Sequence, residues 1–379
     1  MLLTALIFFL ILSILVLIHE FGHYAVARWI GVHVEEFGLG LPPRILGRKI
    51  GKTLYSLNWL PIGGFVKLAG EDEAENSQKS PARNATQSVA GGKVKSQKQY
   101  FWARSKKERA AILVAGVTMN LLLAIGITGF LLTQGVLEPS GRVRIEKVQP
   151  GSPAEMVGLQ ENDVVSSITF GSSDPLTPSD TKTITTPRDL IDTTRAHVDE
   201  KVTITILRDK REQIVTVTPR KNPPPGQGPL GVAITDLELK TYAWYQIPGE
   251  AVRINLLRAK DMFTGVGSTI WRLVTLRAPS ADVAGPIGIA RVTGEAVKFG
   301  WKAVLEFMSI LSLNLAVLNI LPIPALDGGR LAFVFLEKII GKKLRPAFER
   351  SAHQIGMIIL MGLIILVSIN DILKLARGL

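Results

Sequence analysis

Four long apolar runs constrain the fold of this chain more than any other feature of its sequence. A helix needs about 20 apolar residues to cross a bilayer, and it satisfies its own backbone hydrogen bonds without water. The runs lie at residues 2–18, 112–133, 304–326 and 355–369, and the last can extend to 375. The hydrophobic content of 47% agrees with this interpretation. We therefore predict an α-helical membrane protein with four transmembrane helices.

The charges of the connecting segments predict the orientation of these helices. Residues 31–110 carry fourteen Lys or Arg against seven Asp or Glu, and residues 327–354 carry six against three, whereas residues 135–300 carry twenty against nineteen. Because Lys and Arg favour the cytoplasmic side, we expect the first two segments inside and the third outside. This predicts a multi-pass protein of a cell inner (plasma) membrane. The formal charge of +12 then follows from topology, and no nucleic-acid partner is expected.

Residues 140–235 have the pattern of an inserted α+β domain on the extracytoplasmic side. RVRIEKV, DVVSSIT, KVTITILRD and QIVTVTPR alternate as strands do, and Thr186 is the predicted N-cap of a helix. PGSPAEMVGLQENDVV, at residues 150–165, resembles the signature of PDZ domains. Such domains commonly bind an extended peptide as an added strand. A passive role as a plug or size filter over the membrane site is an equal alternative, and the PDZ ligand is unknown.

Gly and Pro punctuate short alternating stretches after the first apolar run, which indicates membrane-associated β-hairpins. The first half of the chain is predicted as a transmembrane helix at 1–30, the hairpin region at 31–70, a flexible cytoplasmic loop and interfacial segment at 71–110, and a second transmembrane helix at 111–134. After the 140–235 domain, we expect an amphipathic connecting region at 236–303, a third transmembrane helix at 304–327, a cytoplasmic loop at 328–354 and a fourth transmembrane helix at 355–375.

The first apolar run leads directly into His19-Glu20-Phe21-Gly22-His23. Ionisable side chains are costly at membrane depth, and there they mark candidate functional sites. If the helix continues through residue 29, His19 and His23 lie one turn apart on one face, where they can bind a zinc ion while Glu20 activates water. The chain has no cysteine, so thiolate ligands are excluded. The motif therefore predicts a metal site with nitrogen and oxygen ligands.

A catalytic zinc site also needs a third protein ligand and one open position. The third apolar run ends in NILPIPALDGG, which places Asp327 at its expected cytoplasmic end, at the same depth as the histidine motif. An aspartate at this depth is a candidate ligand. An interfacial helix cap or a solvated loop acid is the alternative. The other histidines, His33, His197 and His353, are expected at the surface or the membrane interface.

Together with AGVTMN at residues 115–120 and AGPIGIA at 284–290, these motifs resemble the site-2 protease family of intramembrane zinc metalloproteases, over essentially the full chain. The chain is most similar to the bacterial regulator of sigma-E protease type, with a single PDZ domain. One departure is visible, because Val117 follows Gly116 where the family usually has proline.

The resemblance implies specific roles for residues of this chain. His19, His23 and Asp327 would be the zinc ligands, and Glu20 the general base. Two asparagines, Asn120 and Asn319, would position the substrate backbone. The hairpin region would present the substrate as an added strand. These roles imply a hydrolytic centre near the cytoplasmic side of the membrane.

The implied function is that of an intramembrane zinc endopeptidase in regulated intramembrane proteolysis. Its substrates would be single-span membrane proteins, such as anti-sigma factors or signal-peptide remnants, after another protease has shortened their external domain. Transmembrane protein or peptide substrates and membrane lipid are then the expected partners. A non-catalytic membrane PDZ adaptor, which would not need Glu20, is the main alternative. A transporter is a further alternative, but four spans without internal repeats argue against it.

Overall fold

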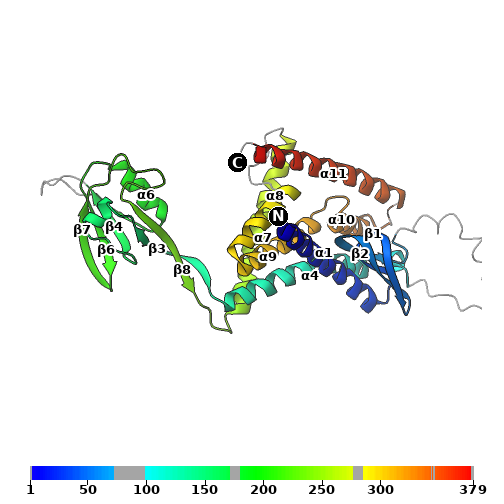
Figure 1. Cartoon of the computed structure of the whole chain (residues 1–379). Helices are drawn as coiled ribbons and strands as arrows, with labels where there is room; N and C mark the ends of the chain where they lie inside the picture. Colours follow the sequence, from blue (N-terminus) through cyan, green and yellow to red (C-terminus); the bar gives the residue numbers. More distant parts are fainter. Residues whose placement is uncertain are drawn as a thin grey trace, which may run out of the picture. The chain divides into compact units, whose positions relative to one another are not determined.

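The computed structural model describes residues 2–71, 99–170, 180–275, 285–342, 344 and 346–376. The chain folds as two units. The first combines Met1–Thr133 with Ala243–Leu379, and the second is the inserted segment Gln134–Tyr242. Figure 1 shows most of the helices in the first unit and most of the strands in the second.

Four helices of the described residues are long and apolar enough to cross a membrane. They are α1 (Leu2–Ile30), α4 (Lys106–Thr133), α9 (Trp301–Ile320) and α11 (Pro346–Ala376). Many large apolar side chains along these helices are exposed, as lipid contact would require. The four predicted spans are therefore confirmed. The helix α1 also continues without a break through the histidine motif.

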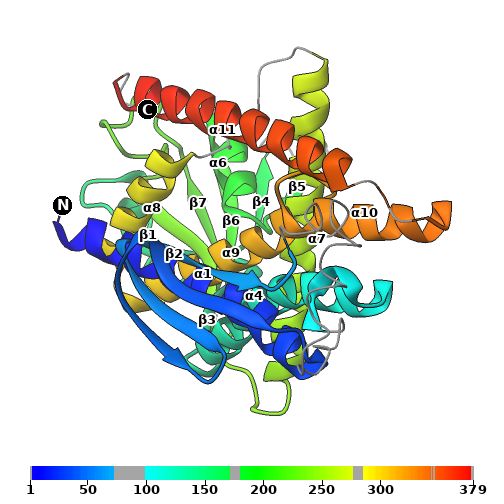
Figure 2. The ribbon, with the colours of Figure 1, turned by 90° about the vertical axis from the view of Figure 1, so that its right-hand side faces the viewer.

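The helices α1, α4 and α9 pack against one another at the centre of the first unit (Figure 2). Ile11 and Leu15 of α1 form an apolar cluster with Met308 and Leu311 of α9. A Cβ atom on Gly22 would lie 2.5 Å from the carbonyl oxygen of Ala115, so α1 and α4 cross at a distance that only glycine permits.

Three more helices, α7 (Ile247–Val274), α8 (Pro286–Phe299) and α10 (Asp327–Ile340), belong to this unit. The third span ends at Ile320, earlier than the expected residue 327, because Pro322 and Pro324 follow. The expected loop at 328–354 is mostly helical, which corrects that prediction. The helix α10 is amphipathic, although the charged residues of this segment had suggested a loop. Its buried residues are Gly328, Gly329, Val334 and Glu337.

The predicted hairpin region forms two long antiparallel strands, β1 (Val34–Ile50) and β2 (Thr53–Leu68). Residues 36–39 of β1 pair on one side with 64–67 and on the other with 54–57. The second half of β2 therefore forms one edge of the sheet. The strand β2 contacts α1, as Figure 2 shows, and a short 3-10 turn at Phe101–Ala103 follows in sequence.

The inserted unit contains a six-stranded sheet in the order β7-β6-β4-β3-β8, with β5 paired to β4. Its strands are β3 (Val136–Val148), β4 (Val164–Phe170), β5 (Asp180–Thr183), β6 (Val202–Arg208), β7 (Arg211–Val217) and β8 (Val232–Lys240), and its helices are α5 (Pro153–Met156) and α6 (Pro187–Ala196). Thr186 caps α6 as predicted. Alternating residues such as Ile204 and Ile206 bury one face of the sheet around Leu190 of α6. The unit is thus an α+β domain with its own core.

Candidate active site

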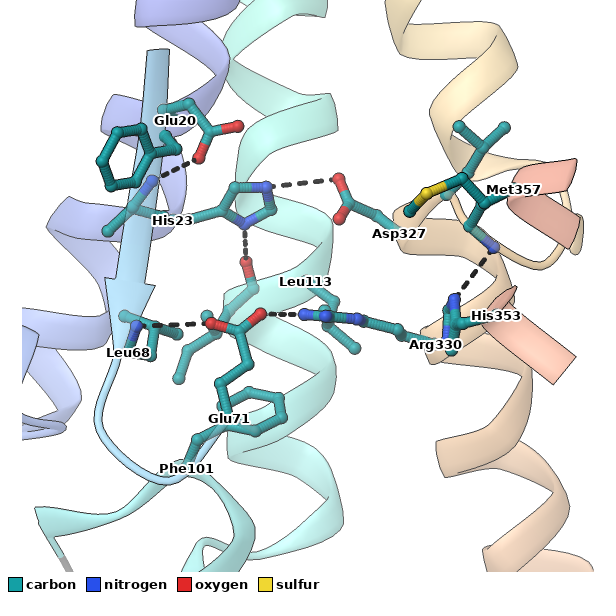
Figure 3. Close-up of a pocket in the computed structure, with 15 residues that line it drawn as sticks. Glu20, His23, Leu68, Glu71, Phe101, Leu113, Asp327, Arg330, His353 and Met357 are labelled. Atoms are coloured by element: carbon teal, nitrogen blue, oxygen red, sulfur yellow. Dashed lines mark hydrogen bonds and ion pairs between the residues drawn. The ribbon is translucent and has the colours of Figure 1, made fainter. Parts of the chain in front are cut away.

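The two histidines of α1 meet Asp327, the first residue of α10. The Nε2 atoms of His19 and His23 lie 3.2 Å apart. The Oδ2 atom of Asp327 lies 2.9 Å from Nε2 of His19 and 3.2 Å from Nε2 of His23. Both imidazoles are buried. Figure 3 shows the Asp327 carboxylate directed towards the His23 ring across the site.

The spacing of these three atoms fits a zinc ion. Ligand atoms at ~2.0–2.1 Å from a tetrahedral zinc are about 3.3–3.4 Å apart. The observed separations of 2.9–3.2 Å therefore need only a small outward shift around the ion. Three nitrogen and oxygen ligands, with the fourth position left for water or substrate, make up the donor set of a catalytic zinc site.

A glycine of α4 provides the space in which the imidazoles meet. A Cβ atom on Gly116 would overlap Nε2 of His23 and lie 2.8 Å from Cε1 of His19. Because Gly116 has no side chain, the centre of the site stays open. Val117, the departure from the family pattern, lies within an unbroken α4, so the helix passes the site with regular geometry.

Hydrogen bonds orient both rings. Nδ1 of His23 donates to the carbonyl oxygen of Ile112 over 2.8 Å, which leaves Nε2 with a lone pair towards the metal position. Asn120 Nδ2 lies 3.5 Å from Nδ1 of His19, and Asn120 Oδ1 has no partner among the described residues. A half-turn of this carboxamide would let His19 Nδ1 donate to Oδ1. Asn319 Nδ2 lies 3.3 Å from Nε2 of His19. Both predicted asparagines therefore lie against His19.

The turn before α10 directs Asp327 into the site. Ala325 has a left-handed backbone with φ of 82°, which costs on the order of 1 kcal/mol for a non-glycine residue. Its N–H donates to Nδ1 of His353 over 2.9 Å. A Cβ atom on Gly328 would overlap the carbonyl oxygen of Leu321, so the turn folds tightly over the start of α10. His353, expected at the surface or the membrane interface, is half-buried and supports this turn.

Glu20 shares a cavity of about 300 Å³ with His23 and Asp327. One oxygen of its carboxylate, Oε2, accepts a hydrogen bond from the backbone N–H of Val66 over 3.0 Å. Figure 3 shows this contact between α1 and β2. The carboxylate is therefore positioned between the metal ligands and the edge of the hairpin sheet.

Two residues of the cavity wall, Glu71 and Arg330, were missed by the sequence reasoning. They form an ion pair, and Glu71 Oε2 also accepts from the N–H of Leu68 over 3.3 Å. Burial lowers the pKa of Arg330, but a guanidinium stays protonated in proteins and brings a permanent positive charge to the site. Arg330 lies three residues after Asp327 on α10, and this helical spacing is the signal that could have identified it.

Comparison with known proteins agrees with this geometry. Residues 7–363 match the peptidase family M50. A Clostridium perfringens protein provisionally named a zinc metalloprotease is 31% identical over 363 residues, which cover 95% of this chain and 96% of the relative. A similarly named protein of Fusobacterium nucleatum is 30% identical over 378 residues, or 98% and 99% of the two chains. The zinc metalloprotease RasP of Oceanobacillus iheyensis is 29% identical over an alignment of 436 positions, which includes 98% of this chain and 99% of the relative. The chain therefore belongs to peptidase family M50, the site-2 protease family, and is a multi-pass membrane zinc metalloprotease.

Proposed function

We propose that this protein hydrolyses peptide bonds of membrane-embedded substrates at the site formed by His19, His23, Asp327 and Glu20. The observation that carries the proposal is the convergence of three ligand atoms, 2.9–3.2 Å apart, two of which belong to a helix long and apolar enough to cross a membrane. His19, His23 and Asp327 would hold the zinc ion. An adaptor that only binds other proteins has no need for this cluster of buried polar groups, whose burial is costly.

Bound zinc would polarise the scissile carbonyl and lower the pKa of a water molecule. Glu20, which lines the same cavity, would take a proton from the attacking water and deliver one to the leaving amine. The hydrogen bond from Val66 holds the Glu20 carboxylate beside the ligands. Asn120, at Nδ1 of His19, would orient that ring, and Asn319, beside the Nε2 atom that would bind zinc, would be left free to position the substrate backbone.

The edge of β2 supports binding of the substrate as an extended strand. A transmembrane helix must unwind before cleavage, because its carbonyl groups are already hydrogen-bonded, and exposed backbone groups in lipid cost several kcal/mol each. The N–H groups of Val66 and Leu68 face side-chain carboxylates of Glu20 and Glu71 and no neighbouring strand among the described residues. An unwound segment could pair with this edge in the cavity.

Single-span membrane proteins are the proposed substrates, including anti-sigma factors and signal-peptide remnants already shortened by another protease. This is the role of an enzyme in regulated intramembrane proteolysis. The loop charges favour an inner membrane location, with the site near the cytoplasmic side and the inserted unit outside.

We assign the inserted unit to the PDZ class. Two features support this assignment, the short helix α5, which begins within the Gly-Ser-Pro-Ala stretch, and the strand that follows Asp163. Ser152 caps α5 and is fully buried. The domain would bind an extended peptide or act as a size filter that excludes substrates with intact external domains.

The experiment compares the wild type with Glu20→Gln in cleavage of a synthetic single-span peptide in lipid vesicles, with the zinc content of the purified protein measured in parallel. We expect both proteins to contain about one zinc ion. Cleavage by the variant should fall by about 10²–10⁴-fold, because general base catalysis is lost. A matched control is Glu295→Gln on α8, which lies outside the cavity. Undiminished cleavage by Glu20→Gln would reject the proposed mechanism.

A further inference from the structure

The edge of β2 that faces the cavity is already occupied by side chains of the same chain. In an extended strand, residues two apart direct their N–H groups to the same side. Val66 pairs with Phe37, and Leu68 with Val34, on the inner side of β2. On the outer side, Val66 donates to Glu20 over 3.0 Å and Leu68 donates to Glu71 over 3.3 Å. Two carboxylates therefore take the place that carbonyl groups of an added strand would occupy.

Charged side chains that cover an exposed edge are a common protection against unwanted strand pairing. Here the covered edge lies in the wall of the candidate active site, so protection and substrate binding involve the same N–H groups. An incoming strand whose carbonyl oxygen accepted a hydrogen bond from the N–H of Leu68 would have to displace Glu71.

Arg330 holds Glu71 in this position. The guanidinium of Arg330 forms an ion pair with Oε1 of Glu71, while Oε2 of the same carboxylate accepts from Leu68. Both side chains are partly shielded from water, with 34% of Arg330 and 19% of Glu71 exposed. Figure 3 shows the row Leu68, Glu71 and Arg330 bridging from β2 to α10 below Asp327. Hydrogen bonds to an ionised group are stronger than those between neutral groups, so this cover is held firmly.

We propose that Glu71, held by Arg330, competes with the substrate for the edge of β2 and thereby sets the affinity of the enzyme for its substrates. This inference rests on the proposed function. The occupant of the edge is an extended peptide segment, because only a strand supplies carbonyl groups at the spacing of Val66 and Leu68. A segment that pairs in this way gains the N–H of Leu68 only after the contact between Glu71 and Leu68 has opened. The pair then favours substrates that unwind easily and excludes weakly bound helices.

The test uses the full chain with Glu71→Ala, which removes the cover, and Arg330→Gln, which removes its support. Amide hydrogen exchange over residues 60–71 should become faster in both variants. In Glu71→Ala the N–H of Leu68 loses its acceptor, and in Arg330→Gln the Glu71 carboxylate loses its ion-pair partner. For a synthetic single-span peptide in vesicles, KM should fall by roughly tenfold in Glu71→Ala and by less in Arg330→Gln, and in Glu71→Ala the change in KM should exceed any change in kcat. The double variant should match Glu71→Ala, because both changes open the same contact.

The matched control is Glu36→Gln, which weakens the ion pair between Glu36 and Arg44 in the same sheet. These two residues do not line the cavity, so KM should not change. An unchanged or raised KM in Glu71→Ala, at normal zinc content, would overturn the proposal. If the wild type bound zinc but cleaved nothing, the proposed function would fail. Binding of the labelled peptide to the same variants would still test the inference, which requires tighter binding in Glu71→Ala and is contradicted by equal or weaker binding.

Discussion

At the scale of single residues, the site depends as much on missing side chains as on the ligands. Gly116 leaves the volume in which the two imidazoles meet, and Gly22 lets α1 approach α4 closely enough for them to reach it. Neither glycine has a chemical role of its own. A substitution at either glycine would affect the metal site only by steric overlap with neighbouring atoms.

Gly116→Ala should therefore weaken zinc binding without unfolding the protein. The added Cβ atom would overlap His23 Nε2, so the ring must leave the position in which it faces Asp327. We expect the affinity for zinc to fall by about 10–100-fold, the range seen when groups that orient metal ligands are disturbed. Titration with a zinc-buffering chelator measures this. Gly126→Ala on the same helix is the control, because a Cβ atom there meets nothing within 4 Å. Equal zinc affinity in the two variants would contradict this view of Gly116.

The sequence singled out the three side chains that the structure brings together because their signals are local. His19 and His23 are one turn apart, and Asp327 precedes a pair of glycines after an apolar run. Glu71, Arg330 and His353 carry no such pattern. The Glu71 and Arg330 pair joins residues 259 positions apart, and only the packing of α10 beside the sheet brings them together.

At the scale of helices, the bundle is joined by a buried polar cluster. Asn255 of α7 donates to Thr128 of α4 over 3.0 Å, and Thr128 Oγ1 lies 3.1 Å from Ser309 Oγ of α9. Hydrogen bonds between helices are a main source of association where lipid replaces water. The cluster therefore fixes α7 to the two central spans.

Asn255→Ala should destabilise the bundle by about 0.6–1.7 kcal/mol, from the average to the largest value found for such bonds in membranes. Denaturation in mixed detergent micelles, followed by the fluorescence of the tryptophans, gives the free energy of unfolding. Thr264→Ala on the exposed side of α7 is the control and should change it little. If both variants were equally stable, the cluster would have no net stabilising effect.

The length of the apolar runs predicted the four spans, because few other structures need about 20 consecutive apolar residues. The same criterion failed for α10, whose charged residues had suggested a loop at 328–354. It also left α7 unplaced within 236–303. Helices of mixed polarity are defined by the partners they pack against, and these partners are distant in sequence.

At the scale of the whole molecule, the inserted unit and the site are separate. The ligand atoms, Glu20 and the cavity all belong to the first unit. The inserted unit begins and ends with paired strands, because Val136 of β3 lies opposite Lys240 of β8. The Cα atoms of this pair are thus about 5 Å apart, and the two ends of the unit lie close to it in sequence. The predicted boundaries, 140–235, missed the first residues of β3 and the last of β8, because these outer ends bury little apolar surface.

Replacement of residues 134–242 by a short Gly-Ser linker should therefore preserve zinc binding. Neighbouring ends can be joined without straining α4 or α7, and loop closure over a few residues is inexpensive. Zinc content and circular dichroism check this outcome. Loss of zinc in a folded helical protein would show that the inserted unit is needed to assemble the site. If the unit is a size filter, substrates with intact external domains should be cut faster.

One face of α4 contributes both to the metal site and to the polar cluster that joins the helices. Ile112, Gly116, Asn120, Ala124 and Thr128 recur every fourth residue on a buried face, so the groups that shape the zinc centre and those that join the bundle stand in one line. A single inserted or deleted residue near position 118 would rotate everything beyond it by about 100°. A change of one residue in the length of α4 at this point would therefore separate the groups at the zinc centre from those that hold the helices together, and one of the two sets would lose its partners.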